Sequence, residues 1–172
     1  MKTGMVRKID ELGRIVIPKE IRRNLKLNMG DVVEIYVEDN KIIFKRFSTL
    51  LGLEEDLFNI AKVINEQNGA TILFVDQDKI IVGYGKLSEN YLDKEILREI
   101  YEKSHETFFN KYKGISLVED YIEDRQIYIT SLHSKKIIHG LFIAIENEHH
   151  FEQKDLDIML QFKKFICKQL DS

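Results

Sequence analysis

The fold of the first 47 residues is decided by the stretch VRKIDELGRIVIPKEIRRNL, which occupies residues 6–25. Within it, the β-branched run at residues 14–17 predicts a strand. Pro18 then predicts the start of a short helix, because proline needs no amide donor in a first helical turn. Gly13 predicts a turn immediately before the strand.

Two further strands are predicted by the alternation of apolar and polar residues over residues 32–37 and 41–45. Asp39-Asn40 lies between them and predicts a two-residue turn, because both side chains tolerate positive φ. With one strand on each side of the Gly13 turn, followed by the short helix and these two strands, the module is predicted as β-β-α-β-β. A domain of this size buries too little apolar surface to fold without a metal, a disulfide or a partner. It contains no cysteine or histidine, so we expect an obligate homodimer through residues 1–47.

Charge divides the chain at the same place. Residues 1–47 hold 11 Lys+Arg and 7 Asp+Glu, a net charge of +4, while residues 48–172 hold the remaining 15 and 22, a net charge of −7. A basic module attracts polyanions such as nucleic acids. Guanidinium groups offer donors to phosphates and guanine edges, so the candidate DNA-binding set is Arg7, Arg14, Arg22 and Arg23 together with the lysines Lys8, Lys19 and Lys26. A solvated charged surface is the alternative interpretation.

Composition limits the remaining classes. The 172 residues, 44% hydrophobic and 32% charged, fit one or two globular domains. No apolar run approaches the roughly 18 residues of a membrane span, and we expect neither a signal peptide nor a membrane partner. The single cysteine, Cys167, cannot form an internal disulfide, which favours a cytoplasmic protein.

Residues 48–52 are predicted as a linker, and residues 53–172 as an α+β domain with a central antiparallel sheet. Helices are expected near residues 53–68, 89–103 and 152–170. Strands are expected at residues 71–75, 79–82, 116–118, 126–132 and 136–145. The last helix is apolar over a wide arc, which fits either burial in its own domain or contact with another subunit.

The pattern R-K-x-D-x-L-G-R-x-x-I-P-x-E-x-R-R begins at Arg7, and with the later strands it covers nearly all of residues 1–47. It resembles the AbrB-type swapped-hairpin DNA-binding domain. The resemblance implies that hairpins of two chains interleave into one β-rich dimeric barrel with one short helix. It also implies DNA contacts at Arg7, Arg14, Arg22 and Arg23, with Lys8 adjacent. The implied partner is double-stranded DNA in A/T-rich or flexible promoter regions, which is read through its shape.

A head of this type joined to a folded domain of about 120 residues resembles the SpoVT/AbrB family of transcription regulators in spore-forming bacteria. The second domain of that family is GAF-like. The resemblance implies activation and repression of late sporulation genes, a nucleoid-associated protein in the forespore, and a homotetramer through the C-terminal domains. An unidentified small ligand is a hypothesis, with Tyr84 between Gly83 and Gly85, and residues 108–121, as candidate walls. A filled core is favoured, and no cofactor is expected.

Two other functions stay open: a nucleoid-type DNA-binding protein, and an antitoxin-like autorepressor whose second domain only oligomerises. Catalysis is not expected, because Cys167 lies in an apolar helix and no nucleophile–base or phosphate-loop pattern occurs. No metal site is expected either. His133, His139, His149 and His150 lack the spacing of metal ligands, and we interpret them as solvated loop histidines.

Overall fold

The computed structural model describes residues 4–25, 27, 32–103, 108–134 and 137–171. It divides into an N-terminal unit, Met1–Phe47, and a C-terminal unit, Ser48–Ser172. The N-terminal unit contains α1 (Lys19–Asn24), β1 (Val33–Glu38) and β2 (Lys41–Arg46). The C-terminal unit contains α2 (Glu54–Asn68), β3 (Thr71–Asp76), β4 (Lys79–Tyr84), the 3-10 helix η1 (Ser88–Asn90), α3 (Arg98–Lys103), β5 (Asn110–Val118), β6 (Tyr121–Ser134), β7 (Ile137–Ile145) and α4 (Gln153–Gln169).

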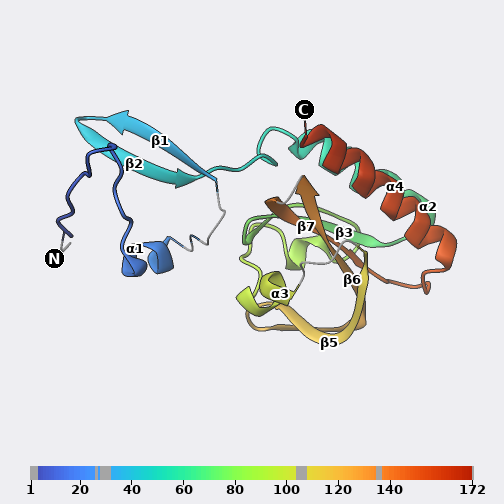
Figure 1. The fold of residues 1–172 in the computed structure, drawn as a ribbon. Helices are drawn as coiled ribbons and strands as arrows, with labels where there is room; N and C mark the ends of the chain where they lie inside the picture. Colours follow the sequence, from blue (N-terminus) through green and yellow to red (C-terminus); the bar gives the residue numbers. More distant parts are fainter. Residues whose placement is uncertain (1–3, 26, 28–31, 104–107, 135–136, 172) are drawn as a thin grey trace. The chain divides into compact units, whose positions relative to one another are not determined.

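In the N-terminal unit, β1 and β2 form an antiparallel hairpin (Figure 1). Asp39 and Asn40 make its two-residue turn with φ values of 47° and 60°, which confirms the turn predicted from these residue types. The short helix is also confirmed, because α1 begins directly after Pro18. Its first turn carries an acidic residue and its last turn two arginines, an arrangement that suits the helix dipole.

The predicted strand over residues 14–17 is wrong for the single chain, since these residues have no strand assignment. The main chains of Asp10 and Arg14 are hydrogen-bonded at 3.0 Å, which closes a hairpin loop. Among the described residues no ladder of hydrogen bonds continues from this loop. An isolated two-stranded ribbon is marginal in water without further strands to pack on it, and the structure shows none packed on this loop in the part of the unit that it describes.

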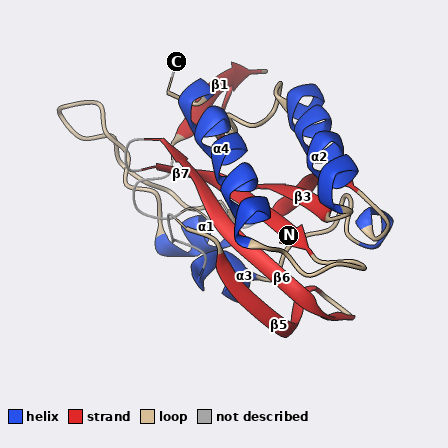
Figure 2. Ribbon diagram, turned by 90° about the vertical axis from the view of Figure 1, so that its right-hand side faces the viewer, coloured by secondary structure: helices blue, strands red, loops and turns tan. Residues whose placement is uncertain are grey.

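The C-terminal unit is built on a five-stranded antiparallel sheet in the order β4-β3-β7-β6-β5. Helices α2 and α4 lie side by side on one face, and α3 lies toward the other (Figures 1 and 2). One core cluster, which includes Phe74, Phe142 and Met159, fills the space under α2 and α4. A second cluster, which includes Leu73 and Ile143, covers the opposite face. The predicted α+β architecture with a central antiparallel sheet is thereby confirmed.

Local signals set the ends of the two long helices. α2 ends where Gly69 adopts a left-handed conformation with φ of 70°, which glycine tolerates at a helix C-terminus. α4 starts with a reciprocal capping box between Glu152 and Asp155, which satisfies amide donors of its first turn. In the described part of the chain, no helix combines the length and the apolar character that crossing a membrane requires.

The predicted helix over residues 89–103 is wrong, because only η1 and α3 form within it. Between them the chain bends at Asp93, whose φ is 64°. The segment then pairs with a strand edge: Asp93 N donates to Ile80 O at 3.0 Å, and Ile80 N donates to Lys94 O at 2.9 Å. Hydrogen bonds to the edge of β4 therefore override the helical periodicity of the sequence. β5 is also longer than the three residues predicted, since its pairing with β6 starts at Asn110.

The predicted linker over residues 48–52 is part of the C-terminal unit. Leu50 is fully buried in the core cluster under α2 and α4. It packs on Gly140 of β7, where an added Cβ would lie 2.6 Å from Leu50 Cδ1 and 2.0 Å from Val75 O. Only glycine leaves room for this contact, so the chain is anchored to the sheet three residues after the boundary between the units.

Candidate nucleic-acid interface

The loop of residues 10–14 presents one of the candidate cations, Arg14. Gly13 N donates to Asp10 O at 2.9 Å, and Asp10 N donates to Arg14 O at 3.0 Å. The loop is a tight turn followed by Gly13 in the left-handed region, with φ of 77°. Three-residue hairpin loops commonly have this geometry, so the sequence Asp-Glu-Leu-Gly-Arg folds locally without help from distant residues.

The side chain of Asp10 holds this loop together. Its Oδ1 accepts hydrogen bonds from Leu12 N at 3.0 Å and from Arg14 N at 2.8 Å. Its Oδ2 accepts one from Arg14 Nε at 2.7 Å. Two hydrogen bonds from Arg14 lower the pKa of Asp10: the bond from its backbone N has the larger effect and the bond from its side chain the smaller. The carboxylate is therefore ionised at neutral pH and fixes one edge of the Arg14 guanidinium.

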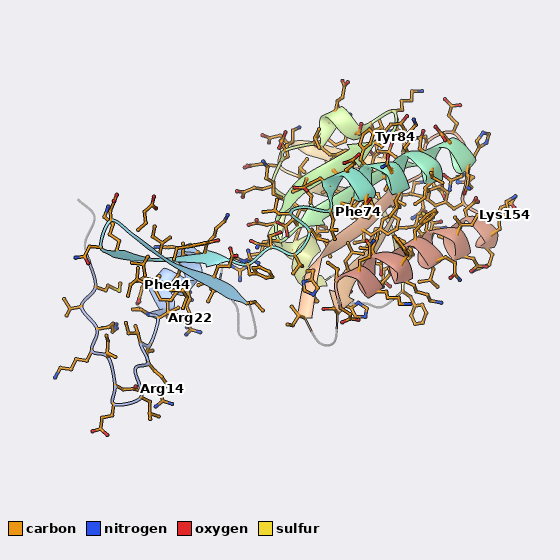
Figure 3. The ribbon with its side chains drawn as sticks, turned by 90° about the horizontal axis from the view of Figure 1, so that it is seen from above. Arg14, Arg22, Phe44, Phe74, Tyr84 and Lys154 are labelled. Carbon is orange, nitrogen blue, oxygen red and sulfur yellow. The ribbon has the colours of Figure 1, made fainter. Side chains whose placement is uncertain are left out.

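The other four predicted DNA-binding residues, Arg7, Lys8, Arg22 and Arg23, are also exposed. Arg7 donates from Nη1 to the neighbouring Val6 O at 3.2 Å. Figure 3 shows Arg14 in its loop and Arg22 on α1. Within the described residues, no hydrogen bond or ion pair joins one of these cations to another. Arg7 Nη1 and Arg14 Nε have protein acceptors, but all five side chains are exposed, so phosphate oxygens can reach their remaining donors.

Apolar side chains of the N-terminal unit are exposed along its whole sequence. The exposed fractions reach 90% at Val6, 77% at Val16 and 80% at Val37. Pro18 is the one buried residue among those that the structure describes in this unit. An apolar surface this extensive on a soluble unit marks an interaction site.

In the described part of the C-terminal unit, the candidate ligand walls belong to the sheet and its core. Tyr84 packs edge-on against Phe58 of α2, with ring centroids 5.2 Å apart, so it belongs to the core beneath that helix. Gly85 permits a close backbone approach, since a Cβ there would lie 2.8 Å from Thr71 Cα. The largest part of residues 108–121 is strand β5 of the sheet itself. An open, polar hollow lies instead at the end of α2, beside Gly69.

Two of the four histidines do not lie in loops, so that part of the prediction is wrong. His133 belongs to β6 and His139 to β7. His139 Nδ1 lies 2.5 Å from Thr49 Oγ1, and its Nε2 lies 2.7 Å from Ser134 Oγ. Burial lowers the pKa of His139, opposed in part by the charge of Asp171. Within the described residues, no group of three or more His, Cys, Asp or Glu side chains is placed to hold a metal ion.

Other polar groups of the C-terminal core are paired inside it. Lys163 of α4 donates to Thr130 Oγ1 at 2.7 Å, and burial lowers its pKa. Tyr91 donates to Glu123 Oε2 at 2.7 Å. Cys167 packs against the apolar cluster under the helices, and burial raises the pKa of its thiol. These contacts hold the helices and loops on the sheet.

Sequence reasoning missed Asp10 and His139. Asp10 was given no role of its own from the sequence, although Asp side chains commonly accept hydrogen bonds from the backbone of their own turn. No local signal identified His139, because its partner Thr49 lies 90 residues away in the sequence.

Comparisons with known proteins bear on both units. Residues 6–44 match the family described as antidote-toxin recognition MazE, bacterial antitoxin. Stage V sporulation protein T of Bacillus subtilis (strain 168) is 35% identical over 130 residues, which is 73% of either chain. The transition state regulatory protein AbrB of the same organism is 60% identical over 45 residues, 26% of this chain and 47% of AbrB.

Two solved structures are similar to parts of this chain. The N-terminal DNA recognition domain of AbrB is 56% identical, with a TM-score of 0.26, and the match covers 28% of this chain and 91% of that domain. The second GAF domain of DevS from Mycobacterium smegmatis is 13% identical with a TM-score of 0.51, and the match covers 66% of this chain and 89% of that domain. At this identity the likeness establishes the GAF fold alone.

Proposed function

This chain belongs to the family of stage V sporulation protein T, and from this we propose that it is a transcription regulator that binds double-stranded DNA through its N-terminal unit. The observation that carries the proposal is the set of exposed cations in that unit, Arg7, Lys8, Arg14, Arg22 and Arg23. They lie within residues 6–44, which match the antidote-toxin recognition MazE family. Exposed guanidinium groups suit phosphate oxygens.

The DNA-binding form is proposed to be a homodimer through residues 1–47. The exposed apolar side chains of this unit, such as Val16 at 77%, need a cover that the single chain does not supply. A second copy whose hairpin interleaves with the first covers them and completes the strand pairing that residues 14–17 lack here. Two copies also double the number of cations that face the DNA.

The finer parts of the function follow from family membership. We propose A/T-rich or flexible promoter regions as targets, and late sporulation genes of the forespore as the regulated set, with both activation and repression. The C-terminal unit is proposed to join two dimers into a homotetramer. The partly exposed Phe58 of α2, at 44%, and Phe165 of α4, at 53%, support a contact between copies through the helical face. A regulatory small ligand for this unit stays a hypothesis.

The experiment that tests DNA binding is a titration of the full chain against a labelled A/T-rich duplex at a series of salt concentrations. If the four arginines of both copies contact phosphates, log Kobs should fall with log [salt] with a slope of about −7. Arg14→Ala removes two contacts from a dimer, so the variant should bind more weakly, with a slope that is shallower by about 2. Light scattering on the same samples gives the oligomeric state.

Lys154→Ala is the matched control. Lys154 is a similarly exposed cation, but it lies on α4 in the acidic unit and pairs with Glu152 at 3.0 Å (Figure 3). This variant should keep the affinity and the slope of the original chain. Equal binding by the original chain, Arg14→Ala and Arg22→Ala would refute the proposal and leave the N-terminal unit as a dimerisation module.

One alternative has a specific observation in its favour. The match of residues 6–44 to an antitoxin family favours an antitoxin-like autorepressor, in which the C-terminal unit only oligomerises. That function requires a toxin as partner, whereas the transcription regulator proposed here does not. A small toxin gene beside this gene, with a product that the purified chain binds and neutralises, would decide for the alternative.

A further inference from the structure

An acidic side chain lies beside Arg14, one of the cations proposed to bind DNA. Asp10 is 42% exposed and stands beside Arg14, within a unit that carries an excess of cations. By charge alone, Asp10 opposes the approach of a polyanion, and its removal should strengthen DNA binding. The hydrogen bonds of the 10–14 loop point to the opposite effect.

Asp10 engages the guanidinium of Arg14 at one edge only. Its Oδ2 accepts from Nε at 2.7 Å, and Nε carries one of the five N–H donors of an arginine. The other four donors belong to the two Nη groups, and within the described residues no acceptor engages them. Since the Arg14 side chain is 72% exposed, the guanidinium is held along its inner edge and presents its outer edge to solvent.

The same carboxylate fixes the backbone from which Arg14 projects. Oδ1 accepts from Leu12 N and Arg14 N at 3.0 and 2.8 Å. An arginine free in solution loses much side-chain entropy when it is ordered on a ligand, and a side chain that is already ordered loses less. Dissolved salt also screens exposed charges that are more than about 10 Å apart, so the repulsion between Asp10 and distant phosphates of the DNA is weak.

We propose that Asp10 is a positioning residue for DNA recognition, which orders the 10–14 loop and orients the guanidinium of Arg14 so that its Nη groups meet the DNA. This inference rests on the proposed function, because it assumes that Arg14 contacts DNA. It adds a second part to the interface: one carboxylate that does not touch the nucleic acid but sets the geometry of a cation that does.

The test compares two neutralising substitutions in the same loop of the full chain. Asp10→Asn keeps Oδ1 as an acceptor for the loop backbone but loses the ion pair with Arg14. Glu11→Gln removes the same charge from the adjacent exposed residue, for which no hydrogen bond or ion pair is found within the described residues. Both are titrated with the labelled A/T-rich duplex. We expect Asp10→Asn to bind about threefold to tenfold more weakly, as for coupled neighbours, and Glu11→Gln to bind equally or more tightly.

A double-mutant cycle separates positioning from general loop stability. In an Arg14→Ala background, Asp10→Asn should cause no further loss, because the cation that it orients is gone. An equal loss in both backgrounds would show that Asp10 supports the loop without acting through Arg14, and would overturn the proposal. Affinity of Asp10→Asn equal to or above that of Glu11→Gln would also overturn it.

Two further measurements keep the outcomes distinct. The Arg14 Nε–H resonance should be resolved and protected in the original chain and lost in Asp10→Asn; its absence in the original chain would contradict the inference. Should Asp10→Asn unfold, Arg14→Lys takes its place, because lysine keeps the charge but has no Nε for Asp10 to hold, and the same loss of affinity is expected. If Arg14→Ala itself leaves DNA binding unchanged, the proposed function fails, independently of Asp10.

Discussion

The two units of this chain differ in where their stabilising contacts come from. In the C-terminal unit, residues far apart in the sequence bury one another on both faces of one sheet, and Leu50, Phe74 and Ile143 are fully buried. In the N-terminal unit, Pro18 alone is buried among the described residues, while Val6 and Val37 keep 90% and 80% of their surface exposed. One chain completes the core of the C-terminal unit, whereas the described residues of one chain leave the apolar side chains of the N-terminal unit exposed.

The same difference separates the charges. The unit with a net charge of −7 has a completed core, and the unit with a net charge of +4 has the unfinished one. We infer that assembly and DNA binding are coupled in the N-terminal unit, because the copy that covers its apolar face also supplies half of its cations. The C-terminal unit contributes a fold that does not depend on that assembly. Substitutions matched between the units test this contrast.

The largest effect is expected for Gly140→Ala in the C-terminal unit. The new Cβ would lie 2.0 Å from Val75 O and 2.6 Å from Leu50 Cδ1, and because Val75 O is a backbone atom, the paired strands must shift to make room. Overpacking of this severity should lower the free energy of unfolding by about 3 kcal/mol. Urea denaturation followed by circular dichroism measures the loss.

Gly4→Ala is the control from the N-terminal unit. No atom lies within 4 Å of the Cβ that would be added at Gly4, so its effect should stay within about 0.5 kcal/mol. Equal stability of the two variants would mean that Leu50 is not seated on Gly140, and that residues 48–52 behave as a free linker after all.

Local signals in the sequence were sufficient for a large part of the fold. The Asp39-Asn40 turn, the helix after Pro18 and the end of α2 at Gly69 were predicted because each depends on the backbone preferences of one to three residues. The five candidate cations are also exposed, as a surface that binds a polyanion requires. Charged residues beside an apolar stripe point to solvent in almost any packing.

What the sequence did not reveal depends on partners distant in the chain. The periodicity of residues 89–103 suggested a helix, but pairing of Asp93 with Ile80 of β4 set the backbone. His139 falls in a strand that was predicted, but it was interpreted as solvated because nothing near it in sequence indicated Thr49 as its partner. The strand at residues 14–17 is a different case. Its pattern is strand-like, but the described residues of one chain give it no strand to pair with.

The next effect tests whether a partner covers that segment. Val16→Ser replaces an apolar side chain that is 77% exposed in the single chain. If a second copy buries it, the substitution should weaken the dimer by about 1.5 kcal/mol per side chain, the lower end of the range for burying a valine. Sedimentation equilibrium on the full chain measures the dissociation constant.

Ile122→Ser is the matched control, since Ile122 is 67% exposed in the C-terminal unit. It should change neither the dissociation constant nor the stability by more than about 0.5 kcal/mol. If Val16→Ser is equally silent, the apolar surface of the N-terminal unit is not covered at this position, and the interleaved dimer is wrong in its geometry.

The smallest effect concerns pH and the boundary between the units. His139 holds Thr49, two residues beyond that boundary, and burial lowers its pKa from the ordinary 6.5. The unfolded chain therefore binds a proton at this site at a pH where the folded chain does not. Stability is complete above about pH 6.5 and falls as the pH drops through that value toward the lower folded pKa.

His139→Gln removes the titration while keeping a side chain that can bond to Thr49 and Ser134. Between about pH 7.5 and about pH 5.5, the original chain should lose more free energy of unfolding than this variant. His149→Gln is the control, because His149 is exposed in the loop after β7. The difference in pH dependence between the original chain and His139→Gln should exceed the difference between the original chain and His149→Gln.

Asp171 and His133 shift the pKa of His139 in opposite directions, upward and downward respectively. Asp171→Asn should therefore enlarge the pH dependence. If the free energy of unfolding has the same pH dependence in all of these proteins, the hydrogen bond to Thr49 survives protonation of His139. Acid then does not destabilise the first residues of the C-terminal unit.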